Sequence, residues 1–161
     1  MKKISGEESR SNCIILVSPI GRYSAFINHI IFNEMRDKTP ERLQKIQFIK
    51  GDISIDELDL SQQDRRELIE NVNVIFHCAA CVKFDFPLKI AVNIQLSGTL
   101  RMLKLAEDMK NLHGFTYIST AFTQQTKLEE KHYPAFVKPL DIIHLMNMGL
   151  EDSTIECLSA E

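Results

Sequence analysis

Two neighbouring hydroxyl groups follow an apolar run late in the chain. Ser119 and Thr120 come directly after residues 115–118, a short aromatic and β-branched run that is typical of a strand. A hydroxyl at the end of such a strand could donate a hydrogen bond to a substrate carbonyl and polarise it. The alternative is that the pair is only the polar end of the strand. Ser119 and Thr120 are therefore candidate catalytic residues.

Small side chains occur at another predicted strand end. Ala79 and Ala80 follow the apolar residues 72–76, and their methyl groups would let a bound molecule approach the backbone. Tight packing of a helix on a strand is an equal alternative. Asp52 follows Gly51 and could accept a hydrogen bond from an adenine amino group, although Gly-Asp is also a common turn pair. The two alanines and Asp52 are candidate cofactor-binding residues.

Two further polar residues lie in predicted helices or strands. Asn93 lies in a predicted long helix, five residues before Gly98, where it could bond across to the neighbouring strand and hold it open for water. A mid-helix asparagine is more often solvated or bonded to nearby backbone. His77 is the only imidazole at the predicted cleft, and a structural histidine with a satisfied hydrogen bond is the favoured interpretation.

The composition favours one globular domain. Of the 161 residues, 44% are hydrophobic and 25% are charged, and the formal net charge is -3. The basic residues form no stripe, so nothing indicates nucleic acid binding. The polar first residues contain no apolar segment of the kind that signal peptides need, and no window approaches ~18 consecutive apolar residues. We therefore expect an intracellular protein with no membrane span in this chain.

The four cysteines favour reduced thiols. Cys78 and Cys81 have the spacing of redox and zinc motifs, but a zinc site needs two more ligands, and the other histidines and cysteines form no second close pair. Two small residues packed at a strand end are the favoured interpretation, with a thiol or zinc module as the alternative. No metal is expected.

Strands and helices alternate along the chain. Ser61 and Asp64 have the spacing of a capping box, which predicts that a helix begins there. Apolar runs predict strands at 13–17, 46–49, 72–76 and 115–118, and helical spacing predicts helices at about 25–35, 61–70, 87–109 and 140–148. Either a short turn of helix or a loop is expected from Pro40. This order predicts an α/β fold with a parallel, doubly wound sheet, whose ligands bind beyond the carboxyl ends of the strands. Asp52, residues 77–80 and residues 119–120 would meet there.

The order of these signals resembles one family, the fatty acyl-CoA reductases of the extended short-chain dehydrogenases. The likeness covers residues 13–145 and is strongest over 40–121, in the blocks 51–52, 73–80, 84–89, 92–93, 98–99 and 117–121. It implies a Rossmann-type fold, NADPH as the cofactor, and reduction of a fatty acyl-CoA to a fatty alcohol through a bound aldehyde.

The resemblance also implies roles for individual residues. Asp52 would recognise adenine, Ala79 and Ala80 would line the cofactor, Asn93 would hold a structural water, Thr120 or Ser119 would supply the catalytic hydroxyl, and Arg22 would face the 2'-phosphate of NADPH.

The chain departs from the family pattern near both ends. The family opens with a Gly-Gly-Thr-Gly-x-x-Gly loop that binds pyrophosphate, whereas no two of the six glycines here lie within five residues of each other. The family's Tyr-x-x-x-Lys pair is also missing, because Tyr133 is followed by Val137 at the lysine position. We expect residues 1–12 to be a disordered tail, 13–122 a partial NAD(P)-binding Rossmann domain without its first strand, and 123–161 the truncated start of a substrate-binding subdomain.

The expected activity is NADPH-dependent reduction of long-chain fatty acyl-CoA, with little or no turnover. Proton-transfer assistance worth ~10² to 10⁴ in rate would be missing with the tyrosine. The alternative is a non-catalytic isoform that pairs with a full-length reductase or another Rossmann protein, since a sheet without its first strand exposes an edge. The family resemblance suggests association with the peroxisomal or endoplasmic reticulum membrane, which this chain does not itself indicate.

Overall fold

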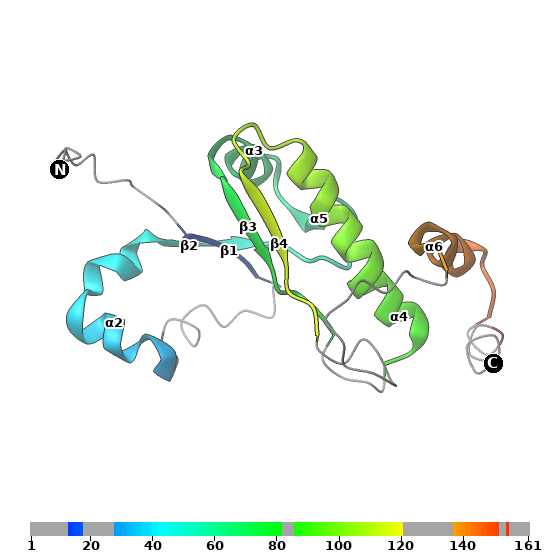
Figure 1. The fold of residues 1–161 in the computed structure, drawn as a ribbon, viewed down its shortest axis with the longest axis horizontal. Coiled ribbons are helices and arrows are strands. Elements are labelled where there is room, and N and C mark those ends of the chain that lie inside the picture. The colour runs from blue at the N-terminus through cyan, green and yellow to red at the C-terminus, as the bar shows by residue number, and fades with distance from the viewer. Residues whose placement is uncertain (1–12, 18–27, 82–85, 121–136, 152–153, 155–161) are drawn as a thin grey trace, which may run out of the picture. The chain divides into compact units, whose positions relative to one another are not determined.

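The computed structural model describes residues 13–17, 28–81, 86–120, 137–151 and 154 (Figure 1). The chain forms two compact units, Met1–Asp52 and Ile53–Glu161, and each is described by itself. The expected tail, Arg22 and Tyr133 lie outside the described residues. No helix within the described ranges is long and apolar enough to cross a membrane.

The first unit contains a pair of parallel strands. β1 (Cys13–Val17) pairs with β2 (Ile46–Lys50). Between them lie η1 (Ile30–Phe32), α2 (Asn33–Lys38) and η2 (Pro40–Lys45). Both strands are rich in β-branched and aromatic residues, which suit the pleated backbone. The two strand predictions and the helical turn from Pro40 are confirmed.

The expected helix over residues 25–35 is wrong at residues 28–32, whereas residues 33–35 are α-helical as predicted. His29 has an extended backbone (φ -63°, ψ 148°), and its Nδ1 accepts a hydrogen bond from the backbone N–H of Ile31 at 3.4 Å. This cap begins a 3-10 turn, and the α-helix begins only at Asn33. Ile30 and Ile31 are 72% and 66% exposed, so the apolar spacing does not mark a buried stripe.

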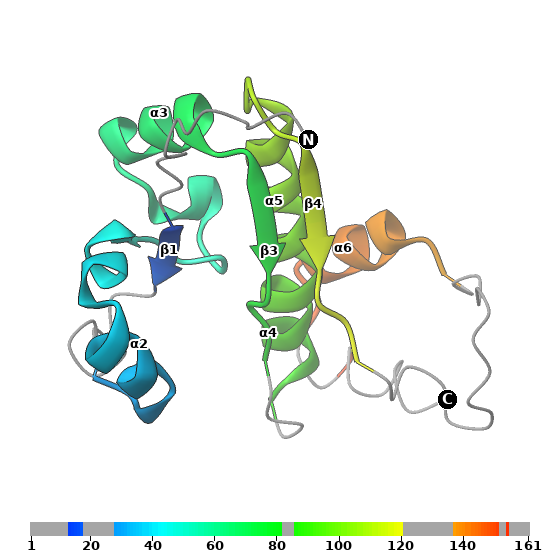
Figure 2. The ribbon, with the colours of Figure 1, turned by 60° about the vertical axis from the view of Figure 1, so that its left-hand side comes forward.

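The second unit is built on another parallel pair of strands. β3 (Val74–His77) pairs with β4 (Gly114–Tyr117). One continuous helical rod connects them: α4 (Leu88–Val92), the π-helical η4 (Asn93–Ser97) and α5 (Gly98–Glu107). The rod lies along both strands in both views (Figures 1 and 2). Parallel strands need such a crossover, and the predicted α/β fold with a parallel sheet is confirmed.

Two more helices complete the described part of the second unit, together with the 3-10 helix η3 (Asp56–Asp59). α3 (Gln62–Asn71) precedes β3, and α6 (Pro139–Asn147) follows β4. Ser61 caps α3, because its Oγ accepts a hydrogen bond from the backbone N–H of Asp64 at 3.0 Å and donates to the Asp64 carboxylate at 2.6 Å. The helix start predicted from the capping box is confirmed.

The core of the second unit draws on α3, β3 and α5. Its buried apolar residues include Leu68, Ile75, Leu105 and Ala106. β3 alternates between exposed and buried residues, so one face of the strand packs inward while the other face stays open.

Candidate functional site

The carboxyl ends of β3 and β4 form one edge, which is where the sequence places its candidate cleft. The two strands are parallel and stay in register to their last residues. Ala79 and Ala80 follow β3, Ser119 and Thr120 follow β4, and all four are exposed. The structure therefore brings the two alanines and the two hydroxyl-bearing residues to the same sheet edge, where an α/β protein binds its ligands.

His77 is the last residue of β3 and is only 4% exposed. Its Nε2 lies 3.2 Å from the Oγ1 of Thr99 in α5, and that hydroxyl donates to the carbonyl of Gln95 at 2.6 Å. Because the Thr99 proton is used in this way, Nε2 must carry the proton that joins the two side chains. The imidazole also packs against the rings of Phe115 and Tyr117 on β4, at centroid distances of 6.1 and 5.6 Å.

Burial sets the charge state of this histidine. Desolvation lowers the pKa of His77 below its usual value of 6.5, because a buried imidazolium loses its hydration. His77 is thus a neutral hydrogen-bond donor that ties β3 to the helical rod, in agreement with the structural role favoured from the sequence.

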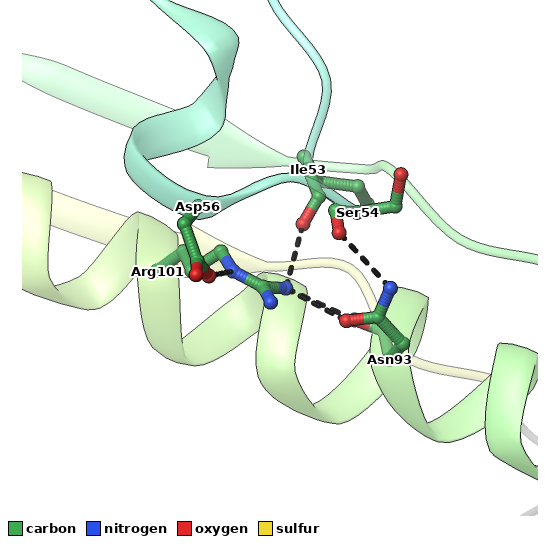
Figure 3. A network of polar contacts seen from close by, with 5 residues as sticks. All are labelled: Ile53, Ser54, Asp56, Asn93 and Arg101. Atoms are coloured by element: carbon green, nitrogen blue, oxygen red, sulfur yellow. Dashed lines mark hydrogen bonds and ion pairs between the residues drawn. The ribbon is translucent and has the colours of Figure 1, made fainter.

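Asn93 lies at the start of the π-helical segment and reaches a loop. Its Nδ2 donates to the carbonyl of Ser54 at 2.9 Å, and its Oδ1 accepts from Arg101 at 3.0 Å (Figure 3). These two partners are in a loop and a helix, whereas the sequence suggested a bond to a strand. The backbone N–H of Gly98 donates to the carbonyl of Asn93, so the five-residue spacing seen in the sequence is that of a π-helical hydrogen bond.

Arg101 is the centre of this network, and the sequence reasoning missed it. Its Nη1 donates to the carbonyl of Ile53 at 3.1 Å as well as to Asn93, and its Nε forms an ion pair with Asp56 at 2.9 Å (Figure 3). The Arg101 side chain is 19% exposed, whereas that of Asp56 is 91% exposed. The guanidinium therefore fastens the loop at residues 53–56 to the rod. The signal in the sequence was the eight-residue spacing from Asn93, which places both residues on one helix face.

Gly98 allows the loop to approach the rod closely. A Cβ at this position would stand 3.1 Å from the carbonyl oxygen of Ile53 and 3.3 Å from its Cβ. The same carbonyl accepts from Arg101, so the glycine and the arginine act on one point of the loop.

Two grooves border α6 in the second unit. One, of about 570 Å³, lies beside the Arg101 network and has Lys89 and Lys104 among its lining residues. The other, of about 300 Å³, lies between the rod, Tyr117 of β4 and α6, and is mostly apolar. The second groove begins next to the strand end that carries Ser119 and Thr120.

The remaining candidate residues lie elsewhere. Asp52 closes the first unit directly after β2 and Gly51, and its meeting with the β3–β4 edge stays a prediction. Cys78 and Cys81 are not joined in a disulfide, and they are exposed and half-buried respectively. Among the described residues, no group of three or more His, Cys, Asp or Glu side chains could hold a metal ion.

Comparison with known proteins adds an independent line of evidence. Residues 17–156 match the family model described as Male sterility protein. The chain is 35% identical over 138 residues to fatty acyl-CoA reductase 1 of Rattus norvegicus, covering 83% of this chain and 27% of the rat protein. It is 36% identical over 137 residues to fatty acyl-CoA reductase 2 of Mus musculus, covering 84% and 26%. The chain thus spans about a quarter of the length of these curated relatives.

A solved structure supports the fold. The reductase domain of PhqB from Penicillium fellutanum matches with a TM-score of 0.52 at 20% sequence identity, over 74% of this chain and 32% of that domain. At this identity the match supports the α/β fold and nothing finer.

Proposed function

The chain belongs to the fatty acyl-CoA reductase family, with a male-sterility-type NAD-binding domain, and from this premise we propose that the β3–β4 edge is one wall of a nicotinamide-cofactor cleft. The observation that carries the proposal is the convergence of Ala79, Ala80, Ser119 and Thr120 at one sheet edge. The two exposed methyl side chains fit a flat ring or a sugar laid against the backbone. The substrate class that we propose is the fatty acyl thioester.

Each side chain at this edge has a proposed task. The nicotinamide cofactor, when bound, supplies the hydride. Ala79 and Ala80 admit the cofactor to the backbone, and the Ser119 or Thr120 hydroxyl donates a hydrogen bond to the thioester carbonyl oxygen, where negative charge develops during reduction. Asn93 holds the loop at residues 53–56 to the rod through Ser54 and orients Arg101 through its Oδ1.

The finer cofactor preference is NADPH over NADH. This rests on Arg22, whose guanidinium we propose to pair with the 2'-phosphate. A hydrogen bond to a charged group is worth about 1.5–3 kcal/mol, so Arg22→Gln should weaken NADPH binding by about 10- to 100-fold and leave NADH binding unchanged. Equal losses for both nucleotides would contradict the assignment of Arg22.

Cofactor binding by the purified chain is the direct test of the cleft. Ala80→Leu places a larger side chain at the proposed cofactor wall, and overpacking of about 1–3 kcal/mol should weaken NADPH binding by about fivefold or more. His113→Leu, at an exposed position directly before the amino end of β4, is the control and should leave the affinity within about twofold. Saturation-transfer NMR or calorimetry gives the affinities. Equal binding by the two variants would refute the proposed wall.

Turnover by this chain should be slow. None of its tyrosines, at positions 23, 117 and 133, is followed by lysine at the fourth position. Without that proton donor, a loss of about 10²- to 10⁴-fold in rate is expected relative to a reductase that has the pair. NADPH oxidation with hexadecanoyl-CoA, compared with a full-length relative in one assay, measures the difference. A comparable rate would refute the proposed impairment.

A second candidate function is favoured by the open face of the sheet. Val74, Phe76 and Ile118 are 49%, 69% and 51% exposed. Such a face suits a protein partner, and we propose a full-length reductase as that partner, with this chain as a non-catalytic module. Co-purification with a co-expressed relative tests this, with Phe76→Lys expected to abolish the complex. Recovery of the chain without the relative would count against the module.

A further inference from the structure

The smaller of the two grooves lies at the meeting of three elements of the second unit and has a volume of about 300 Å³. The helical rod, the end of β4 and α6 each supply part of its wall, through Leu96, Leu100, Leu103, Tyr117, Leu140 and Ile143.

The exposed apolar side chains of this region gather in the groove. Leu103, Tyr117 and Leu140 are 41%, 47% and 57% exposed, and all three line it. Single exposed apolar residues are normal on a protein surface, but several that share one concave wall are typical of a ligand site. The three residues come from three different elements, so the concentration reflects the fold and not one amphipathic helix.

The wall of the groove is mostly apolar, and its polar lining residues are Gln95, Thr99 and Tyr117. The hydroxyl of Thr99 donates to the carbonyl of Gln95 and accepts from His77. The wall is thus suited to an alkyl chain, which needs no hydrogen bond, and poorly suited to a sugar or a peptide backbone, whose polar groups would lose their hydration without gaining partners.

The position of the groove relates it to the candidate cleft. Tyr117 lies two and three residues before Ser119 and Thr120, a separation of at most about 10 Å along the chain. We propose that this groove holds the alkyl chain of the substrate while the thioester carbonyl lies at Ser119 and Thr120. This inference rests on the proposed function, because a fatty acyl thioester is the substrate that needs both parts.

The dependence of affinity on chain length tests the groove. Octanoyl-, decanoyl- and dodecanoyl-CoA, kept below their micelle concentrations, are titrated calorimetrically into the purified chain. Each buried methylene is worth ~0.8 kcal/mol, so the affinity should rise by about fourfold per methylene. Coenzyme A alone gives the baseline. An affinity that does not change with chain length would overturn the inference.

Variants of groove residues test whether the alkyl chain binds in this groove. Leu140→Gln and Leu103→Gln put a polar amide into the groove and should flatten the dependence on chain length. Met148→Gln is the control, because Met148 is 72% exposed and does not line the groove. All three positions are exposed, so the variants should fold, which circular dichroism checks. Equal slopes in the wild type and both groove variants would overturn the assignment.

Crosslinking gives a readout that needs no catalysis. Dodecanoyl-CoA with a diazirine at its terminal carbon should label peptides that contain Leu103 or Leu140, and label confined to other peptides would overturn the inference. A second copy of the chain is the competing occupant. The inference fails if the wild type is dimeric, Leu140→Gln makes it monomeric, and the acyl-CoA affinity does not depend on chain length. The groove is then an interface between two copies of the chain.

Failure of the groove and failure of the cofactor cleft give different results. NADPH binding that is sensitive to Ala80→Leu, together with acyl-CoA affinity that ignores chain length, would leave the cleft standing and remove the groove. A chain-length dependence that Leu140→Gln abolishes, without NADPH binding, would support the groove as an alkyl site and remove the cleft.

Discussion

Replacing Arg101 with methionine removes the guanidinium that fastens the loop at residues 53–56 to the helical rod. The Arg101 side chain is 19% exposed and donates to the carbonyl of Ile53 and to the Oδ1 of Asn93. Methionine has a similar length, so the apolar part of the contact is largely kept while all the hydrogen bonds of the guanidinium are lost. The loop should then detach more easily from the rod.

The magnitude follows from the acceptors left behind. A partly buried acceptor without its donor costs about 1–3 kcal/mol, and two such acceptors remain, so Arg101→Met should lower the free energy of unfolding by about 2–6 kcal/mol. The ion pair adds little, because Asp56 is 91% exposed and water screens it. Asp56→Asn should therefore change the free energy of unfolding by no more than about 1 kcal/mol.

Urea denaturation followed by circular dichroism measures the loss, and hydrogen exchange of the amides at residues 53–60 shows where it occurs. Lys104→Met is the matched control, since Lys104 is an exposed cation three residues further along the same helix, and it should change stability by no more than about 0.5 kcal/mol. A double-mutant cycle with Asn93→Leu should give a coupling energy of about 1–2 kcal/mol. Equal losses for Arg101→Met and Lys104→Met, or a loss for Asp56→Asn as large as that for Arg101→Met, would refute the reasoning.

Three other positions give sharp expectations. Burial lowers the pKa of His77, so between that lowered pKa and 6.5 the unfolded chain binds a proton that the folded chain does not. The free energy of unfolding should therefore fall as the pH drops through this window. His77→Gln should flatten this pH dependence in denaturation curves from pH 8 to pH 5. Glu57 has a left-handed backbone (φ 54°), so Glu57→Gly should stabilise the protein by about 1 kcal/mol relative to Glu57→Ala, which also lacks the carboxylate. Thermal melts in which the alanine variant is more stable than the glycine variant would contradict backbone strain at this position. Ser61→Ala removes the cap of α3 and should lower the free energy of unfolding, measured with urea, by about 1 kcal/mol. Ser61→Asp should retain most of the stability. An unchanged urea midpoint for Ser61→Ala would argue against the cap.

The elements that the sequence predicted well are those whose causes are local. The strands β1 and β2 follow from short β-branched runs, and the start of α3 follows from Ser61 and its acid three residues on. The helix expected over 25–35 begins later than predicted, because the prediction used only the spacing of apolar residues. At His29 a side-chain hydrogen bond to the backbone two residues on favours an extended conformation, and this break has no apolar signature.

The candidate site also has one part that was predictable from the sequence and one part that was not. The β3–β4 edge was predictable because parallel strands must carry their carboxyl ends to one side, whatever the details of packing. The Arg101 network was not, because its acceptors are backbone carbonyls whose position depends on how a loop folds. Glu57, Leu58 and Asp59 have left-handed backbones and turn the chain directly after this loop, and Leu58 is only 2% exposed. A left-handed turn is usually predicted from a glycine, and none of these three residues is a glycine.

One helical rod joins the Arg101 network, the buried His77 and the apolar groove of the second unit. Its Arg101 face holds the loop at residues 53–56, its Thr99 face holds His77 at the end of β3, and Leu103 lines the apolar groove beside Tyr117. Thr99 belongs to two of these features, because it bonds His77 and also lines the groove. An alkyl chain in the groove would therefore touch the residue that fixes the strand end from which Ala79 and Ala80 emerge. Substrate and cofactor binding would then be coupled through the His77–Thr99 pair, so that each would change the affinity for the other by the same factor.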